Sequence, residues 1–262
     1  MWLFLNLNII LNYVLQNIVH MKLIKLDAID STNEFLKGLS NKQVVENFTV
    51  ITTDNQTNGK GQMGAVWDSE IGKNLIMSVL IKDYLLDIGQ IYTLNIIVSI
   101  AVIKALKKRN IPDLSIKWPN DIMSYNKKIG GILIENCIKS DGAIFSIAGL
   151  GLNVNQTNFE NLPKASSMSV VANAYFDIEE LLFEIMEHIE MNVLMGIHKT
   201  EPFWKEYVNL LFRKGIPMPF SGNNNRNFMG IIQGISSIGK LQVLLEDDTI
   251  FEYDIKEIQM LY

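Results

Sequence analysis

The chain has 262 residues, 48% of them hydrophobic, and a formal net charge of −5 at pH 7. This length predicts one large domain with a full core and a second, small domain. The acidic balance provides no basic surface for non-specific nucleic-acid binding. Cys137 is the single cysteine, which excludes an internal disulfide, so we expect a reducing, cytoplasmic setting.

The first twenty residues, MWLFLNLNIILNYVLQNIVH, are apolar but lack the charged start and small-residue cleavage site of a signal peptide. Asn and Gln interrupt the run too often for a membrane span, so no membrane contact is expected. Met21 follows and begins an ordinary strand pattern. We therefore expect a non-native leader or disordered segment at 1–20, a large domain at 21–212 and a small one at 213–262.

After the first strand, residues 30–34 read DSTNE. Asp30 or Ser31 is placed to cap the next helix, and Glu34 would complete a capping box. A cap does not require Thr32 and Asn33. Short donors and acceptors at a helix N-terminus can also bind the polar head of a ligand, and both interpretations stay open.

A strand at 48–53 leads to the glycine-rich sequence GKGQMG at 59–64. Such dense glycines let backbone N–H groups approach an anion, and Lys60 adds a cation. The spacing also fits the GxGxxG fingerprint, which requires a helix that opens within the glycines. Here the strand-like NLIMSVLI at 74–81 follows instead. The pattern therefore predicts a flap between two strands and disfavours a nucleotide-dependent oxidoreductase.

A helical pattern at 88–108 ends in a basic turn and precedes the sequence KWPND at 117–121. Pro, Asn and Asp are typical of a turn, but a turn does not explain Lys117 and Trp118. Lys128 lies in a hairpin turn. It is either an ordinary turn lysine or part of a functional site.

Two strands carry glycines where packing favours larger side chains. The strand at 129–135 contains GG, which is typical of a backbone that something approaches closely. After a turn at 140–142, Gly149 and Gly151 share one face of the strand at 143–155. That face would leave a slot for a flat apolar ligand.

The rest of the chain is a loop-like stretch at 156–174, an amphipathic helix at 178–193 capped by Asp177, and short strands at 228–235, 241–245 and 250–253. Strands this short and regular indicate a small β-barrel. No helix-turn-helix pattern and no metal-ligand spacing is found, so we expect no DNA partner and no metal site built by protein side chains alone.

Four blocks resemble the biotin protein ligases, and they follow the order of that family. The blocks are STN at 31–33, residues 56–72 with GKGQMG and Trp67, KWPND with KIGGIL at 128–133, and GLGLNVN at 149–155. The resemblance covers residue 21 to the C-terminus. It implies an α+β fold: a mixed sheet with helices packed on it, of the class II synthetase-like biotin and lipoate ligase type, plus a C-terminal SH3-like barrel.

The resemblance also implies an activity: ATP, with Mg²⁺, activates biotin as biotinyl-5′-AMP, and the biotinyl group passes to a lysine of a carboxyl carrier domain. The implied catalytic residues are Lys128, Lys60 and Asp121. The implied biotin-binding residues are Ser31, Thr32, Asn33, Gln56, Lys60, Gly61, Gln62, Lys128, Gly149 and Gly151. The implied ATP- and adenylate-binding residues are Gly59, Gly64, Trp67, Lys117, Asn120, Lys128 and Asn153. A homodimer is compatible with the family.

The flap departs from the arginine-rich bacterial pattern, because Lys60, Gln62, Met63 and Ala65 stand at those positions. A Lys does not make the bidentate fork of an Arg, so we expect the adenylate to be held more loosely than in arginine-rich relatives. The alternatives are a lipoate or octanoate ligase on the same fold and, more remotely, a biotin-responsive regulator.

Overall fold

The structure, a computed structural model, describes residues 21–82, 84, 91–138, 142–222 and 226–262. The expected leader at 1–20 lies outside these residues. So do positions 88–90 of the predicted first long helix and positions 140–141 of the predicted turn. No helix among the described residues is long and apolar enough to cross a membrane.

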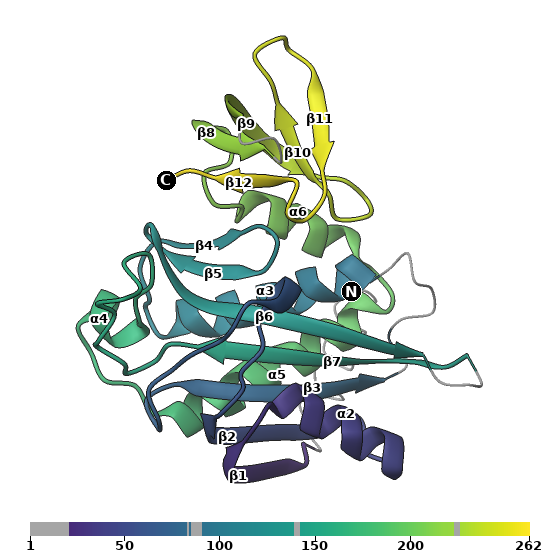
Figure 1. The fold of residues 1–262 in the computed structure, drawn as a ribbon. Helices are drawn as coiled ribbons and strands as arrows, with labels where there is room; N and C mark the ends of the chain where they lie inside the picture. The colour runs from purple at the N-terminus through teal and green to yellow at the C-terminus, as the bar shows by residue number, and fades with distance from the viewer. Residues whose placement is uncertain (1–20, 83, 85–90, 139–141, 223–225) are drawn as a thin grey trace, which may run out of the picture.

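The described residues form a seven-stranded mixed sheet in the order β1-β2-β3-β7-β6-β5-β4 (Figure 1). The strands are β1 (Leu23–Ile29), β2 (Val50–Gln56), β3 (Leu75–Lys82), β4 (Leu114–Lys117), β5 (Asp121–Ser124), β6 (Lys127–Ile138) and β7 (Ile144–Leu152). β1 pairs with β2 in parallel, and the other neighbours pair antiparallel. The predicted flap joins β2 to β3 and contains only one short 3-10 turn, η1 (Gln62–Gly64).

Helices cover both faces of this sheet (Figure 1). α3 (Ile91–Lys108) and α5 (Ile178–Gly196) share a large apolar cluster with alternate residues of the central strands. α2 (Thr32–Lys42) packs on the other face, in a smaller cluster with residues such as Ile51 and Leu80. Because neighbouring strand residues point to opposite faces, the two clusters lie on opposite sides of the sheet.

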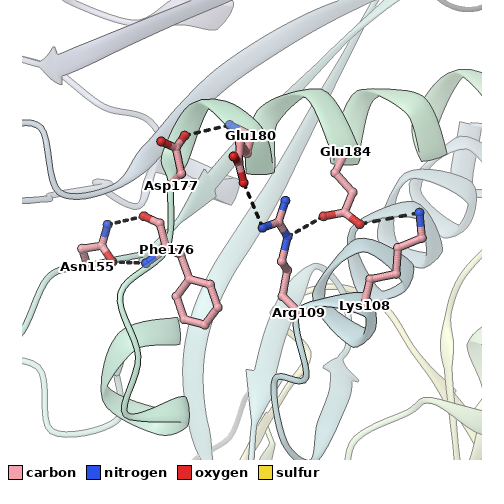
Figure 2. Close-up of polar contacts among 7 residues, drawn as sticks. All are labelled: Lys108, Arg109, Asn155, Phe176, Asp177, Glu180 and Glu184. Atoms are coloured by element: carbon pink, nitrogen blue, oxygen red, sulfur yellow. Dashed lines mark hydrogen bonds and ion pairs between the residues drawn. The ribbon is translucent and has the colours of Figure 1, made fainter.

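The end of α3 is tied to the start of α5 by charged side chains (Figure 2). Arg109 Nε donates to Glu184 Oε2 at 2.6 Å, and its Nη1 lies 3.3 Å from Glu180 Oε2. Lys108 Nζ lies 3.6 Å from the other Glu184 oxygen. Asp177 caps α5 as predicted, accepting from the Glu180 N–H at 2.9 Å. The basic turn therefore pairs with carboxylates of α5 as well as complementing its own helix.

A second, five-stranded antiparallel sheet follows, in the order β11-β10-β9-β8-β12. Its strands are β8 (Pro217–Gly222), β9 (Asn227–Ile235), β10 (Leu241–Leu244), β11 (Ile250–Tyr253) and β12 (Ile258–Met260). α6 (Glu201–Asn209) lies between the two sheets, and a short α4 (Met168–Ala172) interrupts the loop-like stretch (Figure 1). The predicted fold class is confirmed, whereas α4 and α6 were not predicted. The domain boundary after residue 212 stays a prediction.

Candidate active site

A cavity of about 280 Å³ lies on the large sheet, at the start of α2 and under the flap. It brings together segments that are far apart in the sequence. Its lining consists of Ser31, Thr32, Asn33, Gln56, Lys60, Gly61, Gln62, Ala65, Val66, Trp67, Ile76, Met77, Lys117, Pro119, Asn120, Asp121, Lys128, Gly131, Ile132, Leu133, Gly149, Leu150 and Gly151.

A buried hydrogen-bond network forms one end of the cavity. Gln56 Oε1 accepts from the backbone N–H of Thr32 at 2.8 Å and lies 3.1 Å from the Thr32 hydroxyl. The Ser78 hydroxyl lies 2.7 Å from Thr32 Oγ1 and 2.6 Å from Asn33 Oδ1. Asn33 Nδ2 donates to Glu135 Oε2 at 2.8 Å. These contacts fix the orientation of the Thr32 and Asn33 side chains.

Ser31 caps α2 as predicted, since its side chain accepts from the backbone N–H of Glu34 at 3.5 Å. The predicted capping box is wrong, because the Glu34 carboxylate accepts instead from Lys60 Nζ of the flap at 2.8 Å. The hydrogen bond from Lys60 lowers the pKa of Glu34, and the same bond raises the pKa of Lys60.

The glycines of the predicted slot lie where β6 and β7 run side by side, and protein side chains approach two of them closely, so a ligand slot there stays a prediction. A Cβ at Gly149 would lie 2.4 Å from Asn33 Oδ1, and a Cβ at Gly151 would lie 2.4 Å from the Trp67 ring. Gly151 pairs with Gly131, whose Cβ position is 3.4 Å from Lys128 Nζ. The glycine floor therefore runs from the buried network to the lysines of the opposite end.

Two lysines share one carboxylate at that opposite end. Asp121 Oδ1 lies 2.6 Å from Lys128 Nζ, and Asp121 Oδ2 lies 3.0 Å from Lys117 Nζ. Lys117 and Asp121 lie on the antiparallel strands β4 and β5, whose register places them opposite each other. Lys128 Nζ also lies 5.6 Å from the centre of the Trp67 ring. Asp121 thus holds two ammonium groups at the cavity wall.

The turn between β4 and β5 is held by buried partners. The Trp118–Pro119 peptide bond is cis. The Pro119 carbonyl accepts from Asn95 Nδ2 at 3.0 Å and from the Tyr207 hydroxyl at 3.3 Å. Asn120 Nδ2 donates to the Ile132 carbonyl at 2.7 Å. The turn is therefore fixed by α3, α6 and β6 together.

Trp118 has a structural partner that explains its place beside Lys117. Its side chain is buried, and Nε1 donates to the Gly239 carbonyl of the C-terminal sheet at 2.8 Å. A Cβ at Gly239 would lie 2.2 Å from the Tyr92 ring, so the turn between β9 and β10 also packs closely on α3. Trp118 joins the two sheets.

The flap (residues 59–67) folds on itself. The Gly61 N–H donates to the Ala65 carbonyl at 2.7 Å, and the Trp67 N–H donates to the Gly59 carbonyl at 2.9 Å. A Cβ at Gly59 would lie 2.3 Å from the Trp67 carbonyl oxygen, while Gly64 has a φ of +82°. Both glycines are thus required by the flap's own backbone.

The structure brings every predicted site residue to the cavity lining except Gly59, Gly64 and Asn153. Asn153 instead donates from Nδ2 to the Ser166 carbonyl at 2.9 Å. The individual roles of all these residues stay predictions. Sequence reasoning missed Ser78 and Glu135, and their only signal was a polar residue in an apolar strand.

The described residues contain no group of three His, Cys, Asp or Glu that could hold a metal ion. Among the described residues of the lining, Asp121 is the one carboxylate. A single carboxylate is too few ligands for an all-protein Mg²⁺ site, but it suits an ion that arrives on a phosphate.

Residues 26–153 match the biotin/lipoate A/B protein ligase family. The bifunctional ligase/repressor BirA of Bacillus spizizenii is 29% identical over 194 residues, covering 71% of this chain and 59% of that protein. The biotin–acetyl-CoA-carboxylase ligase of Mycobacterium tuberculosis is 23% identical over 195 residues, which cover 73% of this chain and 71% of that protein. The chain thus spans less than two thirds of the Bacillus relative.

Among solved structures, the biotin protein ligase of Aquifex aeolicus in complex with biotin and ATP superposes with a TM-score of 0.76. It is 27% identical, and the match covers 92% of this chain and 98% of that one. The similarity therefore includes both the large sheet and the C-terminal sheet.

Proposed function

We propose that this protein is an ATP-dependent biotin–carrier-protein ligase, because residues 26–153 match the model of the biotin/lipoate A/B protein ligase family. It would activate biotin as biotinyl-5′-AMP and transfer it to a lysine of a biotin carboxyl carrier domain. The observation that carries the proposal is one glycine-floored cavity with a fixed hydrogen-bond network at one end and paired lysines at the other. The similar Aquifex ligase, described in complex with biotin and ATP, supports it.

In the first step the biotin carboxylate attacks the α-phosphorus of ATP. A carboxyl–phosphate bond forms, the bond from the α-phosphorus to the bridging oxygen breaks, and pyrophosphate leaves. Two anions must meet, so preorganised cations and N–H groups supply most of the stabilisation. Lys128, held by Asp121, and Lys60 of the flap are the candidates, together with the flap amides.

Mg²⁺ would accompany the ATP phosphates and would neutralise phosphate charge, and Asp121, which is paired with Lys117 and Lys128, would contribute at most one ligand. No step of the proposal requires an ion held by the protein alone.

In the second step a neutral lysine amine of the carrier attacks the acyl carbon and a carbon–nitrogen bond forms. The bond from the acyl carbon to the oxygen that bridges to phosphorus breaks, and AMP leaves with the electrons of that bond. We propose that Asp121 orients this amine and accepts the proton that it loses. The closed flap would keep water from the mixed anhydride.

The Asp121→Asn variant tests this role. We expect single-turnover transfer from preformed adenylate to fall by about tenfold or more, since a positioned proton acceptor contributes at least that much. Asp113→Asn is the matched control, because Asp113 is exposed and does not line the cavity. Normal transfer in Asp121→Asn would remove Asp121 from the second step.

The decisive experiment is ATP-dependent transfer of labelled biotin to a purified biotin carboxyl carrier domain. The family also includes lipoate ligases, so the same assay is run with lipoate and octanoate. A thermal-shift comparison should show stabilisation by biotin and none by lipoate. Transfer of lipoate in place of biotin would establish the alternative. A cytoplasmic setting suits both ATP as co-substrate and the single thiol.

A further inference from the structure

The flap is held from two sides. On one side Lys60 binds Glu34 at the start of α2, as described above. On the other side Lys256, in the loop between β11 and β12, donates from Nζ to the Met63 carbonyl at 3.0 Å. The second contact therefore joins the tip of the flap directly to the C-terminal sheet.

This second contact borders a separate cavity. The cavity has a volume of about 350 Å³ and lies between the flap, the turn between β4 and β5, and β12. Gln62, Lys117 and Pro119 line both this cavity and the candidate active site. The tip of the flap is thus part of the wall between the two spaces.

The backbone at both ends of the contact is unusual. Met63 has a φ of 55° and Lys256 a φ of 71°, a region that residues other than glycine rarely adopt. Such conformations persist where the surroundings hold them, and they are enriched at functional contacts. A glycine would adopt the conformation of residue 256 more easily, so the backbone alone does not favour a lysine there.

The two anchors differ in what a ligand does to them. If Lys60 turns to a bound carboxylate or phosphate, it leaves Glu34, because both anions would compete for one ammonium. Lys256 does not line the candidate active site, so a ligand bound there does not compete with the Met63 carbonyl for its ammonium. The contact with the C-terminal sheet is therefore the one that can persist while the cavity is occupied.

We propose that Lys256 is a positioning residue that keeps the flap closed by holding the Met63 carbonyl. Through this contact the C-terminal sheet contributes to retention of the acyl-adenylate. The retention part rests on the proposed function, whereas the contact with the flap does not.

Hydrogen exchange of the ligand-free protein tests the contact. The reporters are the Gly61 and Trp67 amides, which are bonded within the closed flap. Lys256→Met should speed their exchange by about five- to tenfold, as expected for the loss of one charge-assisted hydrogen bond, and Lys256→Arg should restore protection. The control is Lys240→Met, which removes a lysine that pairs with Asp254 in the same loop.

The Lys256→Gly variant separates loss of the contact with the flap from loss of folding stability. Glycine relieves the backbone at this φ, so the melting temperature should not fall, yet the flap amides should exchange as fast as in Lys256→Met. Unchanged exchange in both variants would overturn the proposal. Equal acceleration in Lys240→Met would also overturn it, because it would indicate general loosening of the loop.

The retention part is measured on adenylate formed from biotin and ATP. Lys256→Met should release biotinyl-adenylate about five- to tenfold faster and raise the KM for biotin with little change in kcat, since the lysines at the glycine floor are untouched. Release at the wild-type rate despite faster amide exchange would overturn this part. A wild-type protein that makes no adenylate would refute the proposed function instead, and the exchange result would still decide whether Lys256 holds the flap.

Discussion

The two walls of the cavity carry the same cation on very different supports. On the flap, Lys60 stands on a loop with one isolated bridge, to Val66, and its ion pair with Glu34 is nearly half exposed on both sides. On the opposite wall, Lys128 stands on β6 and its partner Asp121 on the neighbouring strand β5, and their side chains are 35% and 14% exposed. One lysine is placed by a surface contact and the other by a sheet.

This difference separates two requirements of the proposed reaction. Transition-state charge is best stabilised by a cation that needs no reorganisation at the moment of reaction, which favours Lys128. Retention of an intermediate requires a wall that opens and closes, which favours Lys60 and the flap. Each prediction below acts on one wall and uses the other wall, or a neighbouring residue, as its control.

The largest effect is expected for Lys128→Ala. Loss of a preorganised cation at the reacting phosphate should reduce biotin-dependent ATP–pyrophosphate exchange by about 100-fold or more. Lys127→Ala is the matched control, since Lys127 binds the Pro163 carbonyl and does not line the cavity. An unchanged exchange rate in Lys128→Ala would mean that Lys128 only stabilises the hairpin turn. The wall formed by β5 and β6 would then have no catalytic cation.

A pair of glycine substitutions compares the two supports directly. In Gly149→Ala the new methyl group would lie 2.4 Å from Asn33 Oδ1, in a network locked by Ser78 and Glu135, so biotin affinity should fall by about tenfold or more. In Gly61→Ala the new contact is with the Ala65 methyl at 3.2 Å, and the loop can yield, so we expect less than about a threefold loss.

Isothermal titration with biotin measures both variants, and circular dichroism checks that each is folded. Equal losses in the two variants would mean that the flap is as rigid as the strand floor, and the contrast between the walls would fail.

The contrast between the walls was only partly visible in the sequence. Glycines in strands at 130–131, 149 and 151 and the KWPND turn were recognisable because local chemistry does not explain them. The structure brings all of them except Gly130 and Trp118 to one cavity. The contacts that hold each wall in place could not be recognised from the sequence, because they involve residues that are distant in the chain. Trp118 binds Gly239, and Met63 binds Lys256, 193 residues further along the chain.

The same reason accounts for the other misses. Glu34 fitted a capping box locally, but Lys60 of the flap competes for its carboxylate and forms the stronger, charged contact. Asn153 is a separate case: it donates to the Ser166 carbonyl outside the cavity lining, and its adenylate-binding role stays a prediction. The short helix α6 has its packing partners on α3 and was not apparent from the polarity of its own sequence.

The smallest effect is expected for Glu34→Gln, which removes the surface anchor of the flap and leaves the strand wall intact. An exposed ion pair contributes little, so the Gly61 and Trp67 amides of the ligand-free flap should exchange only about two- to fivefold faster than in the wild type. Salt screens exposed charges, and the difference should therefore vanish at about 1 M salt. Glu179→Gln is the matched control, because the pair between Lys25 and Glu179 is also exposed and lies away from the cavity.

The same variant has a pH signature with a defined sign. The bond from Lys60 holds the pKa of Glu34 below its ordinary value of 4.5, so the anchor is fully present above that value and is lost as the pH falls through the lowered pKa. Wild type and Glu34→Gln should thus differ at neutral pH and converge in acid. A difference that persists in acid and in high salt would mean that Glu34 acts through packing, and the flap would then share the fixed support of the opposite wall.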